Sequence, residues 1–404
     1  MGLLLVYGFE PGWDASRFAY YGLLGMAHRG PWMEVAVLGE EGPWTGRVRV
    51  SLGGDGAPRL PRGWAVLAAV EPAAAIHRSG GVVLAVDGGC PPGRLLGLLA
   101  RGDLGEAAEA AAGDSVYSPC SFAALTPDGG FLLARGLESR RPLTLGGYGF
   151  DALMAATESA PVTLMGGRRV YDLDAGEAVY GSRFWVERLR RGGTRRTSLF
   201  EYVYMARSDS VVDGVPVYLF RREMGRRLAR HHEADVDLVV GVPETALPYA
   251  VGYAEEKGAK LELGFVSTLG RVRTAVAQFE GGAEERARVL SLKLNPVPGI
   301  YRGRRVAIVD DSVVTGLTLK TVIQRLRRLH GAVEVHVAVS SPRIVRGCPY
   351  RLQAVAEEGL IARHLDDERI ARVLDADSLA WLPLGEAVSY LEERGISPCT
   401  HCMR

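Results

Sequence analysis

Hydrophobic residues follow different patterns in the two halves of the chain. In the first half, short apolar runs separated by turn residues predict β-strands, for example at residues 3–8, 34–39, 64–70 and 80–89. Helical periodicity occurs between them, at 16–28 and at the alanine-rich stretch 93–113. A layered α+β domain is therefore expected there, rather than a pure barrel.

In the second half, continuous apolar runs alternate with helical patterns. The runs begin at residues 236, 260, 304 and 334, and the clearest helices are expected at 247–257 and 318–328. Strands that crossover helices bury on both faces have this pattern. We therefore predict an α/β domain with a mostly parallel sheet and a ligand site at the carboxyl ends of its strands.

The boundary between the two patterns lies in an arginine-rich segment. We predict a first domain at 1–186, a linker at 187–197 and a second domain at 198–404. The segment contains Arg188, Arg190, Arg191, Arg195 and Arg196 around a Gly-Gly pair. Such a run is typical of a solvated linker. A phosphate-binding arm is the alternative.

Composition narrows the class of protein. The 404 residues include 48 basic and 47 acidic side chains, with 47% hydrophobic residues, which excludes a disordered, collagen-like or coiled-coil chain. The balanced charge gives no reason to expect nucleic acid or a membrane as a partner. The chain shows no signal peptide and no run long enough to span a bilayer, so a cytoplasmic location is expected. Five cysteines are too few for a disulfide scaffold, and Cys90 and Cys120 are interpreted as buried structural thiols.

The strongest chemical signal is an apolar strand that enters an acidic pair, a small hydroxylated loop and then a helix. Free N–H groups at a helix start, the positive end of its dipole and nearby hydroxyl groups suit a phosphate dianion. Adjacent carboxylates can accept hydrogen bonds from the two hydroxyls of a ribose. The segment comprises Asp310, Asp311, Ser312, Val313, Val314, Thr315, Gly316, Leu317 and Thr318. An acidic pair alone would indicate only a solvated loop with threonine caps, but the whole order predicts a ribose-phosphate site.

This segment resembles the signature that phosphoribosyltransferases use for 5-phosphoribosyl-1-pyrophosphate (PRPP). The surrounding sequence is similar to the amidophosphoribosyltransferase family of purine biosynthesis. The similarity is carried by SLFEYVYMARSDS at 198–210, VPETA at 242–246, KLNP at 293–296 and SSP at 340–342. The resemblance implies an N-terminal domain with Ntn-hydrolase-like αββα layers, followed by a type I phosphoribosyltransferase domain.

The resemblance also implies roles for individual residues. Asp310 and Asp311 would hold the ribose hydroxyls and, with PRPP, magnesium, and residues 312–318 would bind the 5′-phosphate. The pyrophosphate loop would comprise Glu244, Thr245 and Ala246, where the family usually has Asp-Ser-Gly. Arg273 and Lys293 are candidates for closing the site over pyrophosphate, although residues 267–274 are less basic than the family pattern.

In this family the N-terminal half is a glutaminase whose nucleophile is the cysteine exposed when Met1 is removed. Gly2 stands at that position. No arginine lies between Trp64 and Glu71, where the family clamps the glutamine carboxylate, and Asp87 falls in the turn that should supply a neutral oxyanion-hole donor. We therefore predict a glutaminase-shaped domain without glutaminase activity.

Three cysteines near the C-terminus resemble ligand positions of an iron–sulfur cluster in some family members. They are Cys348, Cys399 and Cys402, and the fourth position is Ser198. An iron–sulfur cluster or zinc could be completed by Ser198 or His401, whereas the alternative is a set of ordinary thiols.

The resemblance implies a glycosyltransferase that uses PRPP and magnesium, with free ammonia or ammonia from a separate glutaminase as the nucleophile. Purine nucleotides are expected as feedback ligands, and a homo-oligomer is expected. The alternative function is a non-catalytic regulator that binds PRPP or a purine nucleotide. A different amine as acceptor is a third reading, for which the sequence names no candidate.

Overall fold

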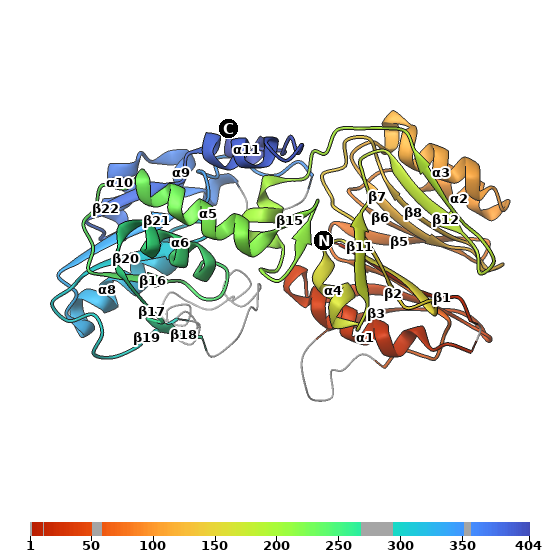
Figure 1. Cartoon of the computed structure of the whole chain (residues 1–404), viewed down its shortest axis with the longest axis horizontal. Helices are drawn as coiled ribbons and strands as arrows, with labels where there is room; N and C mark the ends of the chain where they lie inside the picture. The colour runs from red at the N-terminus through yellow and green to blue at the C-terminus, as the bar shows by residue number, and fades with distance from the viewer. Residues whose placement is uncertain (1, 11, 51–58, 268–293, 351–356) are drawn as a thin grey trace.

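The structure is a computed structural model that describes residues 2–10, 12–50, 59–267, 294–350 and 357–404. In Figure 1 the first half of the chain, from red to yellow, lies beside the second half, from green to blue. None of the helices in the described ranges has both the length and the apolarity needed to cross a membrane.

Within the described residues, the first half forms two antiparallel sheets. The order of the seven-stranded sheet is β11-β9-β10-β1-β4-β2-β3, and the order of the six-stranded sheet is β13-β12-β8-β7-β6-β5. The strands of the first sheet are β1 (Leu3–Gly8), β2 (Trp32–Gly39), β3 (Gly42–Arg49), β4 (Ala65–Val70), β9 (Thr144–Tyr148), β10 (Ala152–Ala156) and β11 (Arg168–Asp172). Those of the second are β5 (Ala74–Ser79), β6 (Val82–Asp87), β7 (Ser121–Leu125), β8 (Phe131–Arg135), β12 (Glu177–Gly181) and β13 (Val186–Arg190).

Alternation along the strands produces four layers. Leu3, Leu5 and Tyr7 of β1 face the core between the two sheets, whereas Leu4 and Val6 face α1 (Ala15–Met26) and α4 (Ser159–Leu164). On the outer face of the second sheet lie α2 (Gly93–Ala100) and α3 (Leu104–Gly113). The predicted αββα layers are therefore confirmed. The single helix expected at 93–113 is wrong, because Gly102 adopts φ 81° and separates α2 from α3.

The second half is built on a parallel sheet with the order β17-β16-β20-β21-β22. Its strands are β16 (Leu238–Gly241), β17 (Lys260–Glu262), β20 (Arg305–Asp310), β21 (Glu334–Val339) and β22 (Ser378–Trp381). One face packs on α5 (Val217–Arg230), α6 (Leu247–Lys257) and α11 (Leu384–Glu392), the other on α8 (Leu317–His330) and α10 (Asp367–Leu374). The predicted parallel α/β architecture is confirmed.

Shorter elements connect these layers. Two small antiparallel pairs are β14 (Val211–Val212) with β15 (Val215–Pro216) and β18 (Phe265–Val266) with β19 (Asn295–Pro296). The remaining helical turns are η1 (Ala27–Arg29), η2 (Ser115–Tyr117), the π-type turn η3 (Glu201–Met205), η4 (Glu357–Gly359), α9 (Ile361–His364) and η5 (His401–Met403).

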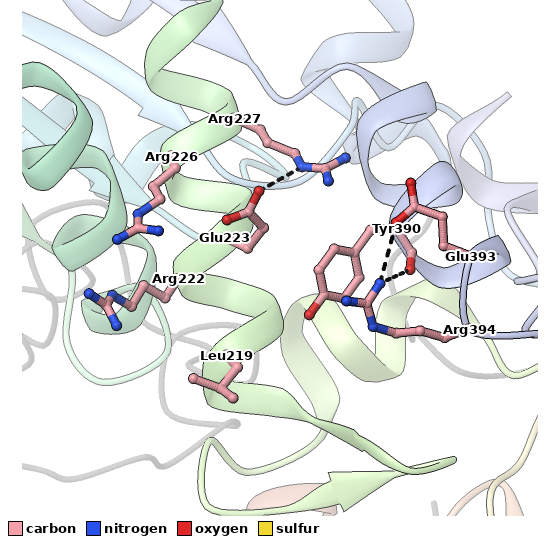
Figure 2. Close-up of a pocket in the computed structure, with 8 residues that line it drawn as sticks. All are labelled: Leu219, Arg222, Glu223, Arg226, Arg227, Tyr390, Glu393 and Arg394. Atoms are coloured by element: carbon pink, nitrogen blue, oxygen red, sulfur yellow. Dashed lines mark hydrogen bonds and ion pairs between the residues drawn. The ribbon is translucent and has the colours of Figure 1, made fainter.

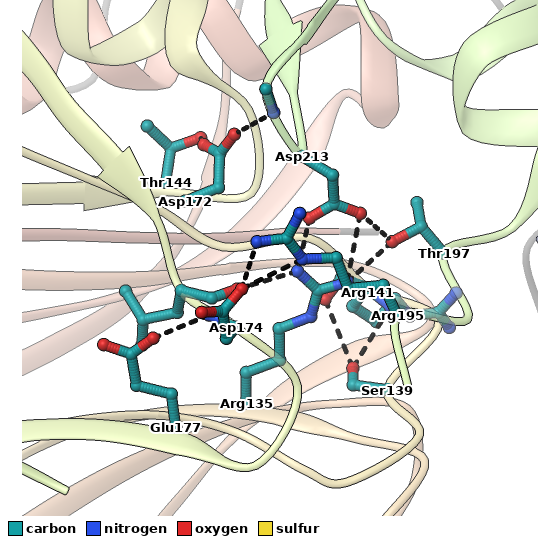
Figure 3. Close-up of polar contacts among 12 residues, drawn as sticks. Arg135, Ser139, Arg141, Thr144, Asp172, Asp174, Glu177, Arg195, Thr197 and Asp213 are labelled. Atoms are coloured by element: carbon teal, nitrogen blue, oxygen red, sulfur yellow. Dashed lines mark hydrogen bonds and ion pairs between the residues drawn. The ribbon is translucent and has the colours of Figure 1, made fainter. Parts of the chain in front are cut away.

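Buried arginines of the first half bind groups of the second half. Arg29 donates to Glu201, and Arg135 donates to both Asp213 and Thr197. Figure 3 shows the Arg135 contacts and, beside them, Arg141, whose guanidinium reaches the backbone oxygen of Tyr350. These contacts lie out of water, so their loss would leave charges buried without a partner.

The arginine-rich segment is structured rather than free. Its first residues, 187–190, pair with β12 as part of β13. Its arginines face carboxylates of the first half: Arg188 and Glu177, Arg190 and Asp174, Arg191 and Glu109, Arg195 and Asp174, and Arg196 and Glu138. The arginines for which the sequence predicted contact with solvent or phosphate therefore form ion pairs within the chain.

Cys90 and Cys120 form a disulfide, so their interpretation as free buried thiols is wrong. Asp87 and Ser121 are opposite partners in the β6–β7 ladder. Cys90 follows Asp87 closely, and Cys120 directly precedes Ser121. The pairing of the two strands therefore brings the Cα atoms of the cysteines to 6.3 Å from each other. Folding thus creates a proximity that their separation of 30 residues does not suggest.

Reducing this disulfide should lower the free energy of unfolding by about 3–4 kcal/mol, because the bond closes a loop of this length in the unfolded chain. Denaturant unfolding with and without reductant measures the difference. The double variant Cys90→Ser, Cys120→Ser should show the lower stability in both conditions. Five reactive thiols in the denatured, unreduced protein would show that the bond does not form.

Candidate functional site

Two loops meet at the carboxyl edge of the parallel sheet. Strands β16 and β20 are neighbours, with Gly241 opposite Val309. The N–H of Val242 donates to the carbonyl of Val309 at 2.9 Å. The loop after β16 and the loop after β20 therefore begin side by side, as ligand-binding loops do in open α/β sheets.

The acidic pair lies at the end of β20 and is nearly buried. Asp310 is 9% and Asp311 8% exposed. The N–H of Asp311 donates to Oδ1 of Asp310 at 2.9 Å, and Oγ of Ser312 donates to Oδ1 of Asp311 at 2.8 Å. These contacts fix both carboxylates at the sheet edge, where carboxylate oxygens suit ribose hydroxyls or a hard cation.

The loop then turns into α8 at Gly316. This residue caps the helix with φ 76°, and no side chain caps it. A Cβ on Gly316 would lie 2.9 Å from Leu374 and 3.3 Å from Ile361, so glycine meets both the backbone and the packing requirement. The first N–H groups of α8 follow directly after Thr315, whose Oγ1 accepts from the N–H of Leu317 at 3.5 Å.

The predicted PRPP segment forms one continuous feature. Val313 is buried in the core, Val314 accepts a backbone hydrogen bond from Ile361 at 2.8 Å, and Thr315 and Leu317 are exposed. Leu317 and Thr318 begin α8. The structure therefore brings residues 310–318 together at the edge where a phosphate would meet the helix dipole.

The predicted pyrophosphate loop lies on the neighbouring strand. The peptide bond between Pro243 and Glu244 is cis. Glu244 is exposed, whereas Thr245 and Ala246 are buried and Ala246 caps α6. The other two predicted contributors, Arg273 and Lys293, lie outside the described residues, as does most of the weakly basic segment before them.

At the glutaminase position, Gly2 is buried at the start of β1. Its carbonyl accepts from the N–H of Val70, and the next N–H, of Leu3, donates to Thr157. A Cβ on Gly2 would lie 2.5 Å from Met26 Cε and 3.3 Å from Arg29 Cδ. These two side chains fill the space in which a cysteine would stand.

A buried ion network surrounds this position. Glu158 accepts from Arg29 at 2.6 Å and contacts Nε2 of His28 at 2.7 Å, and Arg29 also donates to Glu201 at 2.8 Å. Burial alone would raise the pKa of Glu158, but Arg29 and His28 outweigh it and hold this pKa well below its usual value. The sequence did not reveal these long-range partners.

The environment of Asp87 also differs from the expectation. Its side chain is buried and accepts from Nε of Arg141 at 2.8 Å. The charge is therefore paired instead of facing an open oxyanion position. Residues 65–70, where no arginine was found, form the fully buried strand β4.

The C-terminal cysteines lie near one another. Cys399 forms a β-bridge with Ser198. Burial, and then the charges of Cys348 and Cys399, raise the pKa of Cys402 to about 12. Among the described residues, no group of three or more potential ligands is placed to hold a metal ion. The geometry does not fit an iron–sulfur cluster or zinc, and neither is part of the chemistry proposed below.

Two hollows lie away from the sheet edge. A pocket of about 350 Å³ between α5 and α11 is lined by arginines and by Tyr390 (Figure 2). Arg222 and Arg226 donate to Glu255, and Arg227 to Glu223. Another, of about 510 Å³, lies along the Gly192-Gly193 segment. Neither of these two hollows contains a residue of the predicted PRPP segment.

Comparisons with known proteins agree with this geometry. The phosphoribosyl transferase domain family matches residues 221–347. A relative named amidophosphoribosyltransferase from Methanothermobacter thermautotrophicus is 33% identical over 65% of this chain and 55% of the relative. Another of that name, from Archaeoglobus fulgidus, is 35% identical over 60% of this chain and 53% of the relative. The chain spans about half the length of the curated relatives it matches.

The fold matches that of a solved structure. The structure of a glutamine PRPP amidotransferase from B. subtilis, complexed with ADP and GMP, superposes with a TM-score of 0.79, covering 100% of this chain and 96% of that chain at 24% identity. The match to the phosphoribosyl transferase domain family includes the acidic pair and its loop. The chain is thus similar to amidophosphoribosyltransferases over 60–65% of its sequence, and its residues 221–347 match the phosphoribosyl transferase domain family.

Proposed function

We propose that the chain transfers ammonia to C1 of PRPP, releasing pyrophosphate and giving 5-phosphoribosylamine, as a step of purine biosynthesis. The observation that carries this proposal is the buried acidic pair Asp310 and Asp311 leading into the Gly316 turn and α8. It lies within the matched phosphoribosyl transferase domain.

The side chains supply binding and placement. Asp310 and Asp311 hold the ribose hydroxyls, and the start of α8 holds the 5′-phosphate. Glu244 to Ala246 lie beside the pyrophosphate. Oxygen donors at the acidic pair fit magnesium, which would neutralise the leaving group. With C1 held in place and water excluded, displacement by ammonia needs no side chain as acid or base.

Ammonia is proposed because the glutaminase parts are altered together. Gly2 lacks a thiol and is packed against Met26, Asp87 is tied to Arg141, and β4 has no arginine. The source would be free ammonia or a separate glutaminase. We also propose a cytoplasmic homo-oligomer that responds to purine nucleotides.

The test is pyrophosphate release from PRPP and magnesium with ammonium, compared with glutamine. We expect turnover with ammonium only. Equal rates with ammonium and with glutamine would contradict the loss of glutaminase activity. Calorimetry that shows PRPP or nucleotide binding without turnover under either condition would favour the alternative, a non-catalytic regulator.

Asp310→Asn and Asp311→Asn should each lower PRPP affinity by about ten- to a hundredfold, because each removes a charge-assisted hydrogen bond to the ribose. Titration calorimetry measures the change. Asp237→Asn is the matched control, since Asp237 precedes β16 at the opposite edge of the sheet and binds Arg305. Unchanged affinity in both variants would show that the acidic pair does not bind ribose.

A further inference from the structure

Arg207 lies at the junction of the two halves, directly after η3. Its backbone N–H donates to Oε2 of Glu158 at 2.7 Å, and the same oxygen accepts from Oγ of Ser210 at 2.6 Å. Glu158 belongs to the first half and is fully buried. The position of the Arg207 backbone is therefore set by the buried ion network around Arg29.

The same segment is held from the opposite side by the second half. The guanidinium of Arg221, on α5, donates to the carbonyls of Tyr202 and Ala206 and to Oγ of Ser208. Tyr249, in the first turn of α6, donates to the carbonyl of Val203 at 3.0 Å. Since α6 follows the loop of Glu244, these bonds tie the segment that carries Arg207 to the helix after the predicted pyrophosphate loop. The charge of Glu244 in that loop acts on Arg207.

The Arg207 side chain is partly exposed to solvent. It is 34% exposed and forms a two-pronged ion pair with Asp209, both bonds at 2.8 Å. The hydrogen bonds to Asp209 raise the pKa of Arg207, and the charges of Glu158 and Glu244 raise it further. This cation is thus paired with the exposed carboxylate of Asp209 and is also attracted by the carboxylate of Glu244 in the loop.

We propose that Arg207 binds the pyrophosphate group of the substrate, exchanging Asp209 for phosphate oxygens when PRPP arrives. This inference rests on the proposed function. The planar guanidinium offers two parallel N–H donors, which match two phosphate oxygens as they match the carboxylate of Asp209. The cation offsets the repulsion between Glu244 and a polyanionic leaving group.

The assignment gives the first half of the chain a role in phosphoribosyl transfer. Glu158 contributes no atom to the substrate, yet its buried carboxylate fixes the backbone of the arginine that does. Glu158 is therefore a positioning residue, and Arg207 is the ligand-binding residue. A domain that has lost its own nucleophile would still be needed for the chemistry of its neighbour.

The test compares PRPP with ribose 5-phosphate, which lacks the pyrophosphate group, by calorimetry on the full chain. Arg207→Gln should lower PRPP affinity by about ten- to a hundredfold and leave ribose 5-phosphate affinity unchanged. Arg207→Lys should recover part of the loss, because it restores the charge but not the paired donors. Arg222→Gln is the control, since Arg222 is an exposed arginine of α5 bound to Glu255.

Unchanged PRPP affinity in Arg207→Gln would overturn the role of Arg207 while leaving the proposed function intact. Equal loss of both ligands would also overturn it, because the damage would then be general. If the unaltered chain binds neither ligand, the proposed function and the role of Arg207 both fail.

Discussion

Replacing Arg29 with methionine is expected to lower the free energy of unfolding by about 3–5 kcal/mol, the cost of leaving buried charges without their partner. Arg29 is 2% exposed and lies between Glu158 and Glu201, both 0% exposed. Methionine fills a similar volume but donates no hydrogen bond. Two buried carboxylates, one from each half of the chain, would then lose the cation that they share. Glu158 would keep its contacts with His28 and Ser210.

Denaturant unfolding measures this change. Arg47→Met is the matched control, because Arg47 also forms a two-pronged pair with a glutamate, Glu71, but on the surface, where such pairs contribute little. Similar losses in both variants would show that burial does not decide the effect. The pH dependence of stability is a second readout. The pKa of Glu158 is lower in the folded chain than in the unfolded chain. The stability that its ionised carboxylate contributes is therefore present above the ordinary pKa of glutamate and should be lost as pH falls below that value.

The sequence predicted the elements whose signals are local. The apolar run that begins at residue 304 forms β20, and the helix predicted at 247–257 is α6. The same holds for the acidic pair, since strand, carboxylates, small loop and helix are adjacent in the chain. Only neighbours in sequence are needed to recognise these features.

The contacts that join the two halves could not be predicted in this way. Arg29 and Glu201 are 172 residues apart, and Arg135 and Asp213 are 78 apart. Cys90 and Cys120 become neighbours only when β6 pairs with β7. Tertiary packing decides such partners. The sequence therefore predicted free thiols where the folded chain has the Cys90–Cys120 disulfide. It also predicted solvated arginines at 188–196, where the folded chain has ion pairs.

Installing cysteine at position 2 is not expected to restore glutamine use. Catalytic groups that act as a unit are strongly non-additive, so a nucleophile without its partners recovers almost none of the rate. In this chain the Gly2→Cys side chain would begin 2.5 Å from Met26 Cε and 3.2 Å from Thr157 Oγ1. Strand β4 offers no arginine for the substrate carboxylate, and the Asp87 carboxylate, tied to Arg141, cannot donate to an oxyanion.

The measurement is glutamate release by Gly2→Cys after removal of Met1 has been verified by mass spectrometry. Gly12→Cys serves as the control for an added thiol, because a Cβ there meets no atom within 4 Å. We expect no glutamate release above the unaltered chain from either variant, and a lower unfolding midpoint only for Gly2→Cys, which must displace Met26 from a filled core. Turnover by Gly2→Cys would show that glutamine binds elsewhere around β1, and that Arg29 and Met26 move aside to admit it.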